Sequence, residues 1–258
     1  YMPWDVGTRR EGVPDEQALS QIIGALDVDG VFLDTMLQSP PSLRRLVDNA
    51  RTGVAFAPEL HPRIAEMEHC SGSWGQWLRP FPDIGVLHLK WIEPRHIQHQ
   101  IRRWDKTHQD EMAAAWVNGS GILVWENVFA SFNPWNAEDR GTLRRMAPVL
   151  RRFASLLSEG EWLPCFPTSQ NGTVASCWRS NNVRLWTIVK TDEATADQAK
   201  LVVQDRGQLF FDLWQGAALT PNRADGKVYL EVPIERLAGI VALKHELINE
   251  SFLEFIRN

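Results

Sequence analysis

The chain has 258 residues, 44% of them hydrophobic, so it can bury a sizeable core and is neither intrinsically disordered nor fibrous. Its 27 basic and 32 acidic residues leave a net charge of -5, so no global positive field favours nucleic acid as a partner. No apolar run reaches the roughly 20 residues of a membrane helix, and no membrane partner is expected.

Residues 1–160 alternate short apolar runs with helix-like stretches, the pattern of βα units around a parallel sheet. Continuous apolar character suits strands that are buried on both faces. Residues 70–83 are rich in Gly and Pro and predict a long loop over the carboxyl ends of the strands. We expect strands at residues 1–5, 30–34, 53–59, 85–90 and 121–127, and helices at residues 14–26, 41–49, 95–116 and 137–157.

The length of these units favours a barrel. Five units in residues 1–160 take about 32 residues each, and a (β/α)8 barrel uses roughly 250 residues for eight units. An open doubly wound sheet is the alternative, but no Gly-rich phosphate loop follows any predicted strand. The α/β region therefore predicts the later part of a TIM barrel whose first three units are absent.

After residue 160 the chain changes to short β-type runs separated by turn residues such as Asp225 and Gly226. This pattern predicts a small antiparallel β-sandwich over residues 161–246. Residues 247–258 predict a short amphipathic helix or the start of a further element. The β-type runs are residues 174–178, 183–190, 201–204, 208–214, 228–232 and 239–244.

Each predicted strand of the first region ends in an ionisable residue. Functional residues of a parallel barrel lie at the carboxyl ends of its strands. Because such groups must be hydrated or paired, these residues could instead form a ring of salt bridges around the one lysine, with no role in function. Four carboxylates around one cavity suit general acid/base chemistry on a neutral, hydroxyl-rich substrate. The five residues are Asp5, Asp34, Glu59, Lys90 and Glu126.

Asp34 and Glu59 follow the two most strand-like runs. We expect Asp34 to act as nucleophile and Glu59 as general acid/base, because Pro58 and the apolar run before it favour a dehydrated carboxyl with a raised pKa. A separation of about 5 Å would give retention and one of about 6.5–9.5 Å inversion, and both stay open. Glu126 competes for either role, and Asp5 competes more weakly.

Tryptophan is unusually frequent, with 12 residues against 2 tyrosines. Indole faces stack on the C–H faces of sugar rings, while polar side chains hold the hydroxyls. Trp104 and Trp116, on the predicted helix, are expected in the core instead. The expected substrate-binding residues are Asp5, Lys90, Trp4, Trp74, Trp77, Trp91, Trp125, Asn127 and Trp135.

No metal or cofactor is expected. His96 and His99 stand three residues apart on the predicted helix, but Arg95, Arg102 and Arg103 beside them would repel a cation. The three cysteines lack the spacing of a metal site or a disulfide framework. A lyase or aldolase that uses Lys90 as an imine-forming amine is a further possibility.

The runs GVFLDT, AFAPE and LVWENVF, followed by LWTIVKTDE, FFDLWQGAALTP and GKVYLEVPIERLAGIVAL, resemble glycoside-hydrolase-like (β/α)8 barrels with a C-terminal β-sandwich. The resemblance implies a hydrolase of O-glycosidic bonds with a carboxylate pair and a carbohydrate substrate. Asp34 and Glu59 match hydrolases that place nucleophile and acid/base on adjacent strands, whereas Asp5 with Glu59 would match another group. The alternative is a non-catalytic sugar-binding barrel, which needs only the tryptophans.

Overall fold

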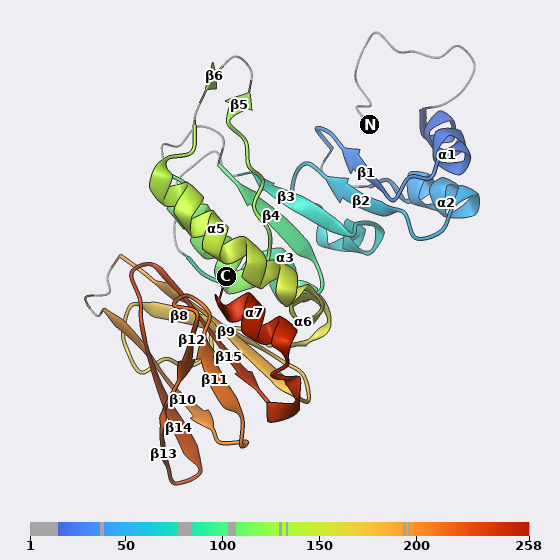
Figure 1. Cartoon of the computed structure of the whole chain (residues 1–258). Helices are drawn as coiled ribbons and strands as arrows, with labels where there is room; N and C mark the ends of the chain where they lie inside the picture. The colour runs from blue at the N-terminus through green and yellow to red at the C-terminus, as the bar shows by residue number, and fades with distance from the viewer. Residues whose placement is uncertain are drawn as a thin grey trace.

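The computed structural model describes residues 15–36, 39–76, 84–102, 107–128, 131–132, 134–192, 195 and 197–257. Helices and short parallel strands form the first half of the chain, and antiparallel strands form the second half (Figure 1). The first half contains α1 (Asp15–Ala25), β1 (Gly30–Leu33), α2 (Pro41–Ala50), β2 (Ala55–Pro58), a 3-10 helix (Ile64–His69), β3 (Gly72–Gln76), α3 (His88–Ile92), β4 (Ile97–Ile101), α4 (Gln109–Asn118), β5 (Asn127–Val128), β6 (Ser131–Phe132), α5 (Ala137–Arg152) and α6 (Ala154–Glu159).

The parallel strands lie side by side in chain order. β1 pairs with β2, and β3 pairs with β4. The Ser71 N–H donates to the Phe56 carbonyl at 2.8 Å, which joins the second strand to the third. Gln100 forms a parallel bridge with Ile122, which adds the following segment to the array. The order of the strands is therefore sequential and does not reverse within the described residues.

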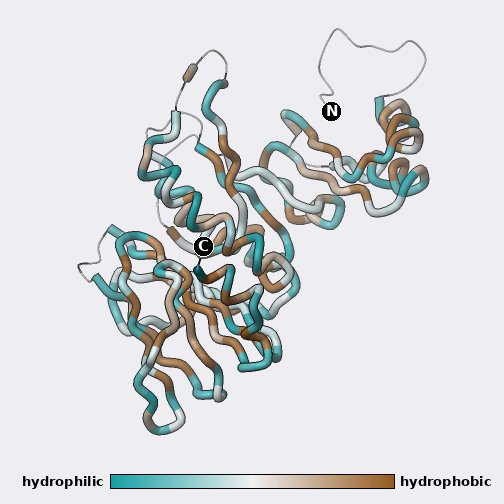
Figure 2. The backbone as a smooth tube through the Cα atoms, viewed as in Figure 1, coloured by the Kyte–Doolittle hydropathy of each residue, from teal (hydrophilic) through white to brown (hydrophobic). Residues whose placement is uncertain are grey.

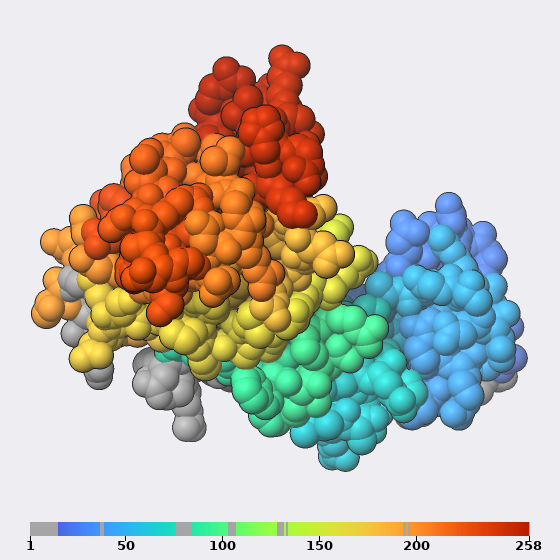
Figure 3. All heavy atoms as spheres, turned by 90° about the horizontal axis from the view of Figure 1, so that it is seen from below, coloured from blue at the N-terminus to red at the C-terminus, as the bar shows by residue number. Residues whose placement is uncertain are grey.

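Helices α1 and α2 cover one face of the first two strands. Apolar side chains from both helices and both strands form one buried cluster there. Leu33 and Phe56 are fully buried in it, whereas Phe32, which alternates with Leu33, is only half-buried on the other face. Figure 3 shows this blue to cyan part of the chain as a lobe that extends away from the C-terminal half.

Two predictions for residues 70–116 are wrong. The expected loop contains β3, and the expected helix at residues 95–116 is β4 followed by α4. These strands lack the apolar pattern because Ser73, Gln98 and Gln100 are buried polar residues. Ser73 Oγ lies 2.8 Å from His96 Nε2, and the Gln98 amide donates to Ser73 Oγ at 3.3 Å. Side-chain hydrogen bonds thus compensate the burial of polar groups.

The prediction of a strand at residues 85–90 is also wrong, since residues 88–90 belong to α3. The buried Asn118 side chain forms hydrogen bonds with backbone groups that would pair with a neighbouring strand if this segment were a strand. Its Oδ1 accepts from the Leu87 N–H at 2.9 Å, and its Nδ2 donates to the Gly85 carbonyl at 2.8 Å. The strands expected at residues 30–34 and 53–59 are confirmed as β1 and β2. Residues 121–127 contribute the Ile122 bridge and the start of β5, and residues 1–5 lie outside the described residues.

The second half forms two antiparallel sheets around a common apolar core. The larger sheet has the order β12-β11-β15-β9-β8-β7 and the smaller one β10-β14-β13. All six expected β-type runs coincide with strands of these sheets. Figure 2 shows the hydrophobic colour concentrated along the strands of this part. The elements are β7 (Glu161–Leu163), β8 (Thr173–Arg179), β9 (Val183–Lys190), β10 (Gln198–Gln204), β11 (Leu209–Asp212), β12 (Ala217–Leu219), β13 (Asn222–Ala224), β14 (Lys227–Pro233), β15 (Leu237–Leu243), a 3-10 helix (His245–Leu247) and α7 (Glu250–Arg257).

Local chemistry accounts for two details of this half. Asp225 and Gly226 both have positive φ angles, 50° and 70°, as a two-residue hairpin turn between β13 and β14 requires. The amphipathic helix expected near the C-terminus is confirmed as α7, which buries Phe252. Among the described helices none is long and apolar enough to cross a lipid bilayer.

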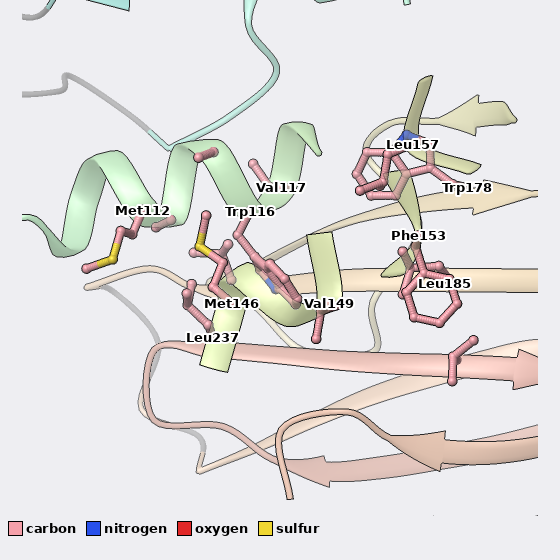
Figure 4. Packing of buried hydrophobic residues seen from close by; sticks show 14 of the residues in the cluster. Met112, Trp116, Val117, Met146, Val149, Phe153, Leu157, Trp178, Leu185 and Leu237 are labelled. Atoms are coloured by element: carbon pink, nitrogen blue, oxygen red, sulfur yellow. The ribbon is translucent and has the colours of Figure 1, made fainter. Parts of the chain in front are cut away.

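A second apolar core joins the two halves. Figure 4 shows Met112 and Trp116 of α4 packed with residues of α5, α6 and the larger sheet. The Trp116 ring is fully buried, and its Nε1–H donates to the Ala238 carbonyl of β15 at 2.8 Å. The expectation that Trp116 belongs to the core is confirmed.

Candidate functional site

Two carboxylates follow adjacent parallel strands at the same edge of the sheet. The register of β1 and β2 pairs Leu33 with Pro58, so that the next residues, Asp34 and Glu59, lie side by side. The Glu59 N–H donates to the Leu33 carbonyl at 3.1 Å, which continues the pairing one residue beyond β2. The strand ends thus position both carboxyl groups through local backbone geometry.

The two carboxyl groups are in contact. Their side chains share a hydrogen bond, and the pKa of Asp34 is raised by burial, by that bond and by the charge of Glu59. Glu59 is only 7% exposed, and its Oε2 accepts from the Thr35 N–H at 2.5 Å. The raised pKa therefore belongs to Asp34, the residue that the sequence argument expected as the nucleophile.

Thr35 adopts an unusual backbone conformation next to this pair. Its φ angle is 60°, in the left-handed region that β-branched residues rarely enter. This conformation aims its N–H at Glu59. Backbone strain of this kind clusters at functional sites, where the surrounding structure holds it in place.

Aromatic rings lie on the same face of the sheet as Asp34. Phe32 precedes Asp34 by two residues and therefore points to the same face. Its ring stacks on Trp74 of β3, with centroids 4.1 Å apart, and Trp125 meets Trp74 edge-on at 5.8 Å. Trp74 and Trp125, both expected as binding residues, thus come together in one aromatic cluster with Phe32.

His99 of β4 extends this face. It pairs in register with Trp74, and burial lowers the pKa of its imidazole. A Cβ atom on Gly121 would lie 2.6 Å from its ring, so only glycine leaves room for this histidine. The expectation that His96 and His99 share a helical face is wrong because His99 belongs to β4 and His96 directly precedes that strand. Within the described residues no group of three His, Cys, Asp or Glu side chains could hold a metal ion.

Glu126 and Asn127 lie at the start of the short β5–β6 hairpin. Both are exposed, and Glu126 Oε1 accepts from the Trp135 N–H at 3.1 Å. Asn127 pairs with Phe132 in the short β5–β6 hairpin. Glu126 thus holds the segment that returns from this hairpin.

Lys90 does not end a strand, so the reason for expecting it among the substrate-binding residues at the strand ends is wrong. It lies on α3 and is 1% exposed. Its Nζ donates to the Pro94 carbonyl at 2.5 Å and lies 5.3 Å from the centre of the Trp162 ring. Burial lowers the pKa of this amine to about 8. Trp91, on the same helix, is 62% exposed and also lies away from any strand end.

Trp135 belongs to a buried cluster, not to an open loop. It is 2% exposed and stacks on His108 with centroids 4.2 Å apart. His108 Nδ1 lies 2.5 Å from Glu111 Oε1, and the His108 N–H donates to Asp139. Its expected role in a loop that binds substrate is therefore a misreading of a core residue. Trp4, Asp5 and Trp77 lie outside the described residues.

Phe32, Thr35 and His99 are the site residues that the sequence analysis missed. Strict alternation with Asp34 could have indicated Phe32. The IQHQI run could have indicated an alternating strand that contains His99. No sequence signal reveals the positive φ angle of Thr35.

No protein-family profile matches the sequence, and no curated protein matches it by sequence. Solved structures do match it. An Anoxybacillus alpha-amylase aligns with a TM-score of 0.58 and 12% identity over 89% of this chain and 63% of its own chain. The Nostoc punctiforme debranching enzyme aligns with a TM-score of 0.58 and 11% identity over 89% of this chain and 61% of its own. AmyP in complex with maltose aligns with a TM-score of 0.56 and 12% identity over 89% of this chain and 67% of its own.

The chain therefore has a mixed α/β fold that resembles amylase-type glycosidases, with a C-terminal antiparallel sheet domain. It spans less than two thirds of the length of the first two of these structures. At these identities the likeness concerns the fold alone.

Proposed function

We propose that the chain is part of a carbohydrate-active hydrolase that cleaves O-glycosidic bonds with Asp34 and Glu59 as its carboxylate pair. The observation that carries this proposal is the hydrogen bond between the two carboxyl groups at the ends of adjacent parallel strands. The fold is of a type found in glycosidases, and one structure with that fold contains maltose. The aromatic cluster of Phe32, Trp74 and Trp125 adds rings that can stack on a sugar.

The proposed reaction is a double displacement. The Asp34 carboxylate attacks the anomeric carbon, the bond from that carbon to the bridging oxygen breaks, and Glu59 donates its proton to the leaving oxygen. A water molecule then attacks the same carbon, Glu59 takes up the proton of that water, and Asp34 is released. Contact between the carboxyls favours the retaining separation of about 5 Å over the inverting gap of about 6.5–9.5 Å.

The proton shared by the pair fits this chemistry. Two carboxyl groups in contact do not both ionise readily, so one proton is retained between them. A sugar ring placed between the two would break their hydrogen bond and so remove the part of the rise in the Asp34 pKa that this bond causes. Asp34 would then ionise, as a nucleophile must, while the buried Glu59 would keep the proton for the leaving oxygen.

We also propose that the parallel strands are part of a (β/α)8 barrel. Sequential parallel order is the order of barrel strands, whereas it reverses in a doubly wound sheet. Helices cover one face of β1 and β2, and the half-buried rings of Phe32 and Trp74 lie on the other face. The remaining units of a barrel would lie over that second face.

Hydrolysis of an aryl glycoside by the full-length protein tests the proposal. We expect Asp34→Asn and Glu59→Gln each to lower kcat by at least about 100-fold, since the first removes the nucleophile and the second a general acid/base, which contributes about 100-fold or more. Asp29→Asn is the matched control, because Asp29 is 97% exposed just before the opposite end of β1. A 2-fluoro glycoside should label Asp34, as mass spectrometry of the digested protein would reveal.

The non-catalytic alternative predicts a different result. If the wild-type protein binds malto-oligosaccharides but hydrolyses no glycoside, and Trp74→Ala abolishes that binding, the protein is a sugar-binding module. A label on Glu59 in place of Asp34 would reverse the two roles and keep the reaction class.

A further inference from the structure

A hollow of about 280 Å³ lies between α5, the turn that joins β11 to β12, and the C-terminal helix α7. Figure 1 shows α5 and α7 next to the larger sheet, whereas β1 and β2 lie in the separate N-terminal lobe. The hollow is therefore distinct from the Asp34–Glu59 pair. Its volume lies just below that of most ligand-binding cavities, which are about 300–1,000 Å³, and suits a single ring.

The hollow is positively charged in an acidic protein. Arg144, Arg145 and Arg257 line it, and no carboxylate among the described residues does. Within the described residues none of these three guanidinium groups forms an ion pair, although the chain as a whole carries a net charge of -5. All three side chains are exposed, and a bound anion would offset the positive charge that they place around the hollow.

An indole forms part of the wall between these cations. Trp214 is half-buried, and Arg145 lies 6.0 Å from the centre of its ring. The same ring also meets the Trp116 ring, at a centroid distance of 5.5 Å and 61°. The buried core thus holds the indole in place, and an apolar ring surface stands beside the guanidinium groups.

The backbone around the indole is also fixed. The Asp212 carboxylate accepts from the backbone N–H groups of Trp214 and Gln215 at 2.8 and 3.0 Å. Gly216 has a φ angle of 65°, and a Cβ atom there would lie 2.5 Å from the Ile256 carbonyl of α7. The turn and the helix therefore meet closely at a glycine, and the hollow between them is preorganised.

We propose that this hollow binds an acidic sugar, a single saccharide ring that carries a carboxylate or a phosphate. The C–H face of the ring packs on the Trp214 indole, and the oxyanion pairs with Arg144, Arg145 and Arg257. Guanidinium groups match carboxylate and phosphate oxygens with two parallel hydrogen bonds, which a neutral sugar does not offer. The ligand thus attaches at the junction of the two halves, away from the strand-end carboxylates.

Isothermal titration calorimetry of the full-length protein with glucuronate, glucose 6-phosphate and glucose tests this proposal. We expect one or both acidic sugars to bind at least tenfold more tightly than glucose, with an affinity that falls as NaCl is added. The acidic sugar that binds more tightly shows whether the hollow prefers a carboxylate or a phosphate. Equal binding of glucose and both acidic sugars, or no binding of any of them, would overturn the proposal.

Variants locate the site. The double variant Arg144→Gln/Arg145→Gln and the single variant Arg257→Gln should each weaken acidic-sugar binding at least tenfold. Arg151→Gln is the matched control, since Arg151 is exposed on α5 and does not line the hollow. Asp34→Asn should leave this binding unchanged, which separates it from the proposed hydrolase site. Wild-type affinity in both the double variant and Arg257→Gln, with circular dichroism unchanged, would place the ligand elsewhere and refute the inference.

Discussion

The smaller sheet of the second half and the strands β3 and β4 of the first half bury different kinds of residue. In β14 the buried Val228, Leu230 and Val232 alternate with exposed residues, and the sheets around them enclose an apolar core. In β3 and β4, by contrast, Ser73 and Gln98 are buried and hydrogen-bonded to each other. The smaller sheet follows the simple rule of an apolar interior, and the parallel half departs from it beside the strands that carry the candidate site. Departures from local patterning are thus most informative where function is expected.

The largest expected effect concerns the core that joins the halves. Trp116→Ala should lower the free energy of unfolding by about 3–5 kcal/mol, the usual cost of removing a large buried aromatic side chain. It would also leave the Ala238 carbonyl without its hydrogen bond. Urea denaturation followed by circular dichroism measures the loss. Trp91→Ala, at a 62% exposed position of α3, is the control and should change stability by less than about 0.5 kcal/mol. A loss below about 1 kcal/mol for Trp116→Ala would mean that the halves fold without this contact.

A smaller effect should appear on acidification, and only in the parallel half. Burial, and next the charge of Lys90, lower the pKa of His96 to about 4, with His61 and His99 acting in the same direction and Glu93 against it. An unfolded histidine has a pKa of about 6.5, so the stability that neutral His96 contributes is complete above that pH. It is lost as the pH falls from about 6.5 to about 4, by on the order of 3 kcal/mol in total.

Urea denaturation at a series of pH values checks this expectation. His96→Gln should flatten the fall in stability across that window, whereas His245→Gln, at an exposed position after β15, should leave it unchanged. Hydrogen exchange should locate the acid-induced opening in residues 84–102 and spare residues 173–190. If the free energy of unfolding fell with pH equally steeply in the wild-type protein and in His96→Gln, the assignment of this fall to His96 would be wrong.

The smallest expected effect concerns the ion pair that joins Arg236 of the sheet domain to Asp110 of the first half. Arg236, which follows β14, contacts Asp110 of α4 at 2.6 Å and Asp192 at 2.5 Å. The groups are partly exposed, so Arg236→Gln should cost no more than about 1 kcal/mol and less at high salt. A double-mutant cycle with Asp110→Asn measures the coupling. Arg179→Gln, whose partner Glu161 lies within the sheet domain, should show no coupling to Asp110→Asn. A coupling that persists in about 1 M NaCl would rule out a screened surface pair.

Much of the sheet domain could be predicted from the sequence, because alternation and turn residues are local signals. The same signals found β1 and β2, and with them the adjacent positions of Asp34 and Glu59. They failed at residues 85–90, where the distant Asn118 side chain takes the backbone hydrogen bonds of the expected strand. They also failed for the aromatic cluster, because the stacking of Phe32 on Trp74 depends on the lateral order of three strands.

The sequential order of the parallel strands has a consequence for how the chain folds. β1 pairs Gly30 with Ala55, and β3 pairs Gly72 with Ile97, so each contact closes a loop no longer than one βα unit. In the sheet domain Trp186 of β9 pairs with Ile240 of β15, across most of that domain. Loop-closure entropy makes distant pairings slower to form than near ones. The parallel array can therefore grow strand by strand as the polypeptide emerges from the ribosome, whereas the sheet domain must wait for β15, nearly its last element.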